Sequence, residues 1–131
     1  KIALSEVENS TSAPKRVLVN DFISSIIKGD KDKAISTIIL TKDSNISIKL
    51  FIALVLEKLR IALIIKNAPT MIDKFRGDVS EEDMALLSDL AKLKEGKLNS
   101  ALLLELLKVY DITGRSYIDS LPLELMVVDK V

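Results

Sequence analysis

The carboxylates of this sequence gather most densely at residues 78–83, where Asp78, Glu81, Glu82 and Asp83 lie within six positions. Carboxylate oxygens are the ligands that hard divalent cations such as Ca²⁺ take in proteins. Three of these acids also follow Ser80, a residue type favoured at helix N-termini, where the positive end of the helix dipole attracts acidic side chains. The dipole explains the cluster without an ion, so we interpret it as the first turn of a helix.

The basic side chains offer a second kind of chemistry, contact with nucleic acid. Lys92, Lys94 and Lys97 form a modest cluster near an expected helix C-terminus, and further lysines lie on the 58–66 segment. Cations at a helix C-terminus also suit the dipole, and 19 basic residues balance 19 acidic ones. We therefore expect no direct nucleic-acid contact, and we keep a lysine-based nucleic-acid-binding domain as the alternative function. Arg60, between two apolar residues, is expected at a helix end or an interface, paired with Asp or Glu.

Most catalytic chemistry is excluded because the chain has no histidine and no cysteine. Imidazole acid–base catalysis, thiolate nucleophiles and zinc clusters need those residues. The sequence also lacks the GxxxxGK[ST] loop that binds nucleotide phosphates. We predict no catalytic site, no metal and no cofactor within this chain. The lack of cysteine is typical of a reducing cytoplasm, which is the expected location.

Composition predicts an all-α domain. The 131 residues are 48% apolar, mainly Leu and Ile, with five aromatic residues, four glycines and three prolines, and a chain of this length can bury a real core. The first residue is Lys1 and no signal-peptide pattern follows, so we expect a piece of a longer protein. Charges on the most apolar segment leave no run long enough to span a membrane, and no membrane partner is expected.

Periodicity and helix punctuation predict a compact bundle of five to six helices, preceded by a polar tail or linker at residues 1–13. Pro14 is expected to open the first helix and Gly29 to end it, with Asp30 or Asp32 capping the next. Asn45 is the expected cap of the main segment, which is apolar on nearly all sides and so is predicted to be surrounded by other helices. The expected helical segments are 14–28, 33–40, 46–66, a turn or short helix at 71–75, 80–95, 100–113 and 121–128.

The last helix has almost no polar face. Ser120, Pro122 and Glu124 predict its start, and the apolar residues that follow must pack against something. In a domain without visible chemistry, such a helix indicates packing or association rather than catalysis.

Taken in order, the segments resemble the third, helical domain of the gamma/tau subunit of the bacterial DNA polymerase III clamp loader, over roughly residues 15–131. The FISSIIKGD run resembles the first helix of that domain, and the PLEL run resembles its ending. Residues 117–119 differ, because many relatives have additional prolines there. The other segments that carry the resemblance are 33–35, 50–52, 56–60, 63–66 and 102–110.

The resemblance implies a collar domain that joins clamp-loader subunits (gamma/tau, delta and delta-prime) for DNA replication. It also implies a parent subunit with AAA+ ATPase domains that bind ATP and magnesium, both outside this chain. The delta and delta-prime subunits share the domain type, so the choice among the subunits stays open. The residues expected at a subunit interface are Leu121, Leu123, Leu125, Tyr110 and Arg60.

Overall fold

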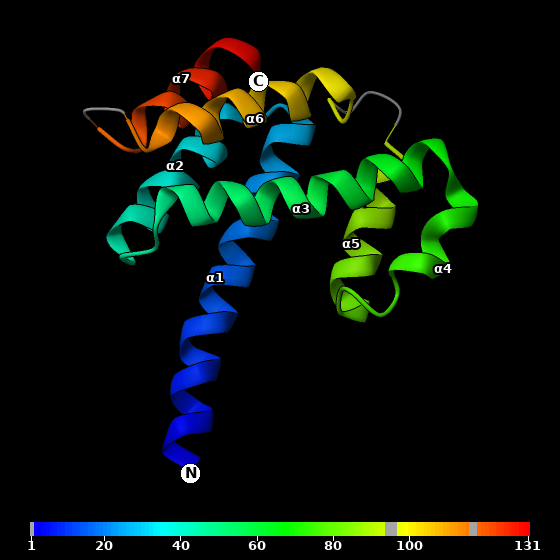
Figure 1. Ribbon diagram of the computed structural model, residues 1–131, viewed down its shortest axis with the longest axis horizontal. Coiled ribbons are helices and arrows are strands. Elements are labelled where there is room, and N and C mark those ends of the chain that lie inside the picture. Colours follow the sequence, from blue (N-terminus) through cyan, green and yellow to red (C-terminus); the bar gives the residue numbers. More distant parts are fainter. Residues whose placement is uncertain (1, 94–96, 116–117) are drawn as a thin grey trace.

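The described residues of the chain form seven α-helices and one turn of 3-10 helix (Figure 1). The computed structural model describes residues 2–93, 97–115 and 118–131, with the backbone alone described for 2–14. These residues contain no strand, which confirms the all-α prediction, and the four-residue α4 raises the count above the five to six helices expected. The elements are α1 (Ile2–Lys28), α2 (Lys31–Asp43), α3 (Ile48–Asn67), η1 (Pro69–Met71), α4 (Ile72–Phe75), α5 (Glu81–Ala91), α6 (Ser100–Thr113) and α7 (Leu121–Lys130).

Helix α1 begins at Ile2, so the prediction that Pro14 opens the first helix is wrong. Proline is favoured in the first turn of a helix and costs a hydrogen bond and a steric clash in its interior, yet α1 continues through Pro14. Figure 1 shows the N-terminal part of α1 extending away from the other helices. The C-terminal part packs into the bundle, where Val19, Phe22 and Ile23 are buried.

Two short connections show how local sequence sets the helix ends. Gly29 has φ +79°, the left-handed conformation that glycine adopts without steric cost, and the Asp30 side chain accepts a hydrogen bond from the Lys33 N–H. The expected cap Asn45 is not a cap: it turns the chain at φ +60°. Ser47 caps α3 instead, accepting from the Leu50 N–H at 3.2 Å. Asparagine tolerates the left-handed region, so it serves the turn and leaves the cap to serine.

The 20-residue α3 lies at the centre of the bundle (Figure 1), packed against α1, α2, α5 and α6. Its inner side contributes fully buried residues, among them Phe51, Ile52 and Leu59. Phe51 meets Phe22 of α1 edge to face, with ring centroids 5.3 Å apart. The predicted burial of this helix is correct for most of its circumference, while Leu50 and Arg60 face solvent.

The second half of the chain packs on α3 from two sides. Helix α5 ends at Ala91, and residue 95, where the sequence predicts the end of this segment, lies outside the described residues. Asn99, one of the two residues that the sequence offers as this cap together with Ser100, caps α6 by accepting from the Leu102 N–H at 2.9 Å. Helix α7 then packs on α6 and α2, so the last helix forms the outer layer of the bundle.

Candidate protein–protein interface on α6 and α7

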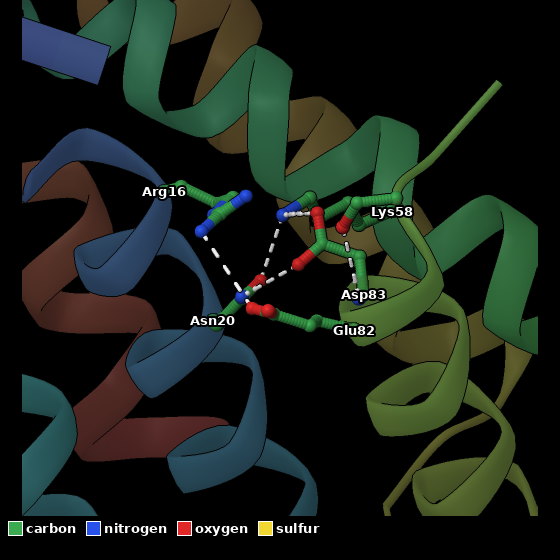
Figure 2. A network of polar contacts seen from close by, with 6 residues as sticks. Arg16, Asn20, Lys58, Glu82 and Asp83 are labelled. Atoms are coloured by element: carbon green, nitrogen blue, oxygen red, sulfur yellow. Dashed lines mark hydrogen bonds and ion pairs between the residues drawn. The ribbon is translucent and has the colours of Figure 1, made fainter. Parts of the chain in front are cut away.

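One residue of the acidic segment at the start of α5, Asp83, belongs to a polar cluster that joins three helices (Figure 2). Asp83 accepts a hydrogen bond from the Asn20 side-chain amide of α1 at 2.9 Å and pairs with the Lys58 ammonium of α3 at 2.8 Å. Lys58 also donates to the side-chain amide oxygen (Oδ1) of Asn20 at 2.7 Å. The three groups satisfy one another, so this polar cluster (Asn20, Lys58 and Asp83) holds α1, α3 and α5 together.

The electrostatics of the polar cluster favour the charged carboxylate. Burial acts to raise the pKa of Asp83, but hydrogen bonds from Lys58 and Asn20, with the charges of Lys58 and Arg16, outweigh it. The pKa of Asp83 therefore lies below its ordinary value. The Asp83 N–H also donates to the Ser80 hydroxyl at 3.1 Å, so the predicted helix start is confirmed.

The remaining acids of this segment serve the helix terminus. Glu81 and Glu82 lie in the first turn of α5 with Asp83, and Glu82 lies 3.7 Å from Arg16 in an exposed ion pair. Within the described parts of the chain, no group of three or more carboxylates is arranged to hold a metal ion. The described geometry therefore gives the acidic residues a structural role.

Several lysines of the nucleic-acid alternative contact the protein itself. Lys66 donates to the Leu98 carbonyl oxygen and Lys97 donates to the Val131 main-chain oxygen, both at 2.7 Å, and Lys58 belongs to the polar cluster. Lys94 lies outside the described residues. Lys58, Lys66 and Lys97 therefore connect separate segments of the chain.

An apolar groove of about 680 Å³ runs between α6 and α7. Figure 1 shows the two helices side by side at the edge of the bundle, joined at one end. The apolar side chains that line the groove include Val109, Ile112, Leu121, Pro122, Leu125 and Val128. Two ion pairs also line it, Lys108 with Glu105 at 3.5 Å and Lys130 with Asp129 at 3.8 Å. A large apolar groove at the surface is the kind of feature that marks an interaction site on a globular domain.

The outer side of α7 carries an apolar stripe. Leu121, Leu125 and Val128 are spaced by four and three residues, which places them on one side of a helix. Leu125 and Val128 are 57% and 60% exposed, and Leu121 is half-buried. Leu123 is 0% exposed, because two residues from Leu121 the side chain points to the opposite side of the helix. Leu123, although expected at an interface, therefore belongs to the core of the folded chain.

The other two expected interface residues, Tyr110 and Arg60, line a second groove of about 290 Å³ between α3 and α6. Arg60 pairs with Glu57 at 2.9 Å, as the sequence predicts, and its guanidinium lies 5.7 Å from the Phe75 ring centroid. The ammonium of Lys49 lies 4.9 Å from the Tyr110 ring centroid. This groove is smaller than the α6–α7 groove, so we treat it as the flank of the candidate interface.

Three exposed apolar residues that line these two grooves were not among the expected interface residues. They are Leu107 and Ile112 of α6, with Val128 of α7. A helical wheel anchored on the buried Leu102, Leu106 and Val109 places Leu107 away from the core and Ile112 at the edge of the buried side. Which leucines were buried could not be known before the packing of α6 on α3 was known.

The described residues include no helix long and apolar enough to cross a lipid bilayer. Comparisons of the chain with models of known protein families, with curated proteins and with solved structures found no match. The functional argument therefore depends on the sequence pattern and on the surface geometry.

Proposed function

We propose that this chain is the helical oligomerisation domain of a DNA polymerase III clamp-loader subunit of the gamma/tau type. In this role it joins subunits into the collar that carries the ATPase domains and serves to load the sliding clamp during DNA replication. The observation that carries the proposal is the apolar α6–α7 groove with its half-exposed rim residues Leu125 and Val128. The order of the helical segments, which resembles the clamp-loader domain, supplies the choice of partner.

The contrast between polar and apolar groups supports an association role. The polar cluster of Asn20, Lys58 and Asp83 is satisfied by contacts within the chain, which suits a structural joint. The α6–α7 surface leaves large apolar side chains facing water, and burying them against another protein is favourable by about 25 cal/mol per Å² of apolar area. Association is thus the process that would stabilise this surface.

The test is complex formation with purified delta and delta-prime clamp-loader subunits, followed by size-exclusion chromatography with light scattering over a concentration series. We expect complexes whose mass increases with concentration. Leu125→Glu should weaken them at least about tenfold, because burying an unpaired carboxylate in an apolar contact costs more than 1.4 kcal/mol.

Val17→Glu is the matched control, because Val17 is an equally exposed apolar residue on α1 that does not line the groove. This variant should assemble like the unchanged chain. If the chain stays monomeric with every partner, the proposal is wrong. Tight duplex-DNA binding at physiological salt, abolished by Lys92→Glu, would favour the lysine-based alternative instead.

A further inference from the structure

We propose that residues 69–79, which we name the strap, open as a unit while α3 and α5 stay folded, and that this opening uncovers apolar surface between those two helices. The strap connects α3 to α5 and contains η1 and α4. Figure 1 shows α4 at the edge of the bundle, away from α1, α2 and α7. No strap residue lines the α6–α7 groove, so this conformational change is independent of the proposed function.

Few side chains of the strap pack against the bundle. Neither η1 nor α4 has a buried residue. Ile72, Phe75 and Val79, spaced by three and four residues, are partly buried against the core, and the other strap residues are exposed. Arg76 pairs with Asp73 at 2.8 Å, and because both lie in the strap, this ion pair attaches it to no other helix. Segments with few buried apolar contacts have low local stability.

Two hollows lie between the strap and α5. The larger, of about 370 Å³, is lined by Ile72 and Val79 of the strap and by Met84 of α5. The smaller, of about 250 Å³, is lined by Ile72 and by Ile65 of α3. Unfilled space forfeits packing contacts, so the strap is weakly packed on both sides of Ile72. Ile65 and Met84 are 7% and 5% exposed, and they are the apolar surface that an open strap would uncover.

The two ends of the strap are suited to act as hinges. At one end the chain leaves the helical conformation at Ala68, with φ −139° and ψ 74°, directly before Pro69. At the other end lies Gly77, and glycine restricts backbone rotation least. Between the hinges, the Arg60 guanidinium of α3 lies 5.7 Å from the Phe75 ring centroid. Such a cation–π contact is weak at an exposed site, so it holds the closed strap on α3 only loosely.

Native-state hydrogen exchange, followed by NMR at several low urea concentrations, tests the opening. The Ile72 N–H donates to the Pro69 carbonyl oxygen and the Asp78 N–H donates to the Phe75 carbonyl oxygen at 3.0 Å, so opening must precede exchange at both amides. Relative to their intrinsic rates, we expect both to exchange at least about a hundredfold faster than the amide of the buried Leu87 in α5. Their exchange should depend little on urea, because a local opening exposes little surface.

Two glycine variants separate local opening from global unfolding. Gly77 has no positive φ, and outside its chain neighbours no described atom lies within 4 Å of an added Cβ. Gly77→Ala should therefore restrict the open strap and slow exchange of both strap amides about two- to fivefold. Gly114→Ala is the matched control, because a Cβ there makes an ordinary contact with the Lys49 Nζ at 3.7 Å. This control should leave exchange of the strap unchanged.

Variants at Ile72 should act in the opposite direction. Ile72→Ala removes part of the apolar contact that closes the strap, so it should speed exchange of the Asp78 amide about tenfold. Ile72→Val removes a single methylene and should speed the exchange by a smaller factor. Circular dichroism confirms that each variant folds.

Thiol labelling tests whether opening uncovers the apolar surface. The chain has no cysteine, so one introduced thiol reports on one position. Met84 and Leu90 of α5 are similarly buried, but Met84 lines the larger hollow and Leu90 lines neither hollow. The thiol of Met84→Cys should react with an aromatic disulfide reagent at least about tenfold faster than that of Leu90→Cys. Adding Gly77→Ala should slow the Met84→Cys reaction about two- to fivefold.

The two experiments decide both halves of the proposal. Faster exchange of the strap amides, slowed by Gly77→Ala and not by Gly114→Ala, supports opening as a unit. If the strap amides exchange together with Leu87, or if both glycine variants slow them equally, the strap unfolds only with the bundle and the proposal is wrong. If the strap opens while Met84→Cys reacts no faster than Leu90→Cys, the uncovering of the apolar surface is wrong.

Discussion

Two regions of this molecule differ in whether their side chains find partners within the chain. They are the junction of α1, α3 and α5, and the surface formed by α6 and α7. At the junction of α1, α3 and α5, the charged and polar groups of Asn20, Lys58 and Asp83 pair with one another at 2.7–2.9 Å. At the α6–α7 surface, Leu125 and Val128 remain more than half exposed. The charged groups at the junction therefore pair within the fold, and in the proposed function the exposed aliphatic residues are the ones that would contact a partner.

The same difference occurs within α7, where the side chain of Leu123 points into the core and the side chain of Leu125 points to solvent. Leu123→Ala should lower the free energy of unfolding by about 2–5 kcal/mol, because it leaves a cavity in the core, and Leu123 is 0% exposed. Leu125→Ala should change it by less than about 0.5 kcal/mol while weakening association. Urea unfolding of both variants checks this pair. Equal losses of stability would contradict the assigned direction of the helix.

Asp83→Ala should be the next largest effect, lowering the free energy of unfolding by about 3 kcal/mol. Removing one partner of a buried ion pair leaves the other charge uncompensated, which costs about 3–5 kcal/mol, and we expect the lower end because the Lys58 side chain keeps 14% of its exposure. Asp78→Ala is the matched control, since Asp78 is exposed, and should be nearly neutral. A loss below about 1 kcal/mol for Asp83→Ala would show that the polar cluster does not hold the helices.

The same carboxylate predicts a pH dependence. Its pKa is lower in the folded chain than in the unfolded chain, so its contribution is fully present above about pH 4, near the unfolded pKa of aspartate. The contribution is lost as the pH falls through the lower folded pKa. The difference in unfolding free energy between the unchanged chain and Asp83→Asn should therefore stay constant above about pH 4 and shrink as the pH falls below it. A difference in unfolding free energy that stays constant down to pH 2 would contradict the lowered pKa of Asp83.

Arg60→Ala should have the smallest effect, a loss of about 1 kcal/mol or less. Its partner Glu57 is one turn away and both side chains are at least half exposed, and exposed ion pairs contribute about 0–1 kcal/mol. Thermal unfolding at low and high salt checks it. A large, salt-sensitive loss would mean that the α3–α6 groove depends on this pair.

Local rules predicted much of the fold and little of the site. Gly29 with Asp30, and Ser80 with its acidic turn, marked real helix ends because caps depend on neighbouring residues. The helix start predicted at Pro14 was wrong, because α1 runs through this proline. The cap predicted at Asn45 was wrong, because asparagine suits a left-handed turn as well as a cap. The partner of Asp83 on α1 is 63 residues away in sequence, and no local rule locates it.

For the residues expected at a subunit interface, the sequence likewise could not tell which would be buried in the core. The sequence marks Leu121, Leu123 and Leu125 alike as apolar residues of the last helix. Their separation into one core residue and two surface residues follows from the side on which α7 packs against α6 and α2. That side is a tertiary property, fixed only once the neighbouring helices are placed.

The most direct test of the central claim is a footprint of the assembled state by amide and methyl NMR, recorded with and without unlabelled delta-prime subunit. We predict that the methyl signals of Leu125, Val128 and Ile112 shift or broaden, while those of Val17 and the backbone signals around the polar cluster stay unchanged. Changes confined to α1, α4 or α5, with the α6–α7 signals unaffected in a complex that forms, would contradict the account.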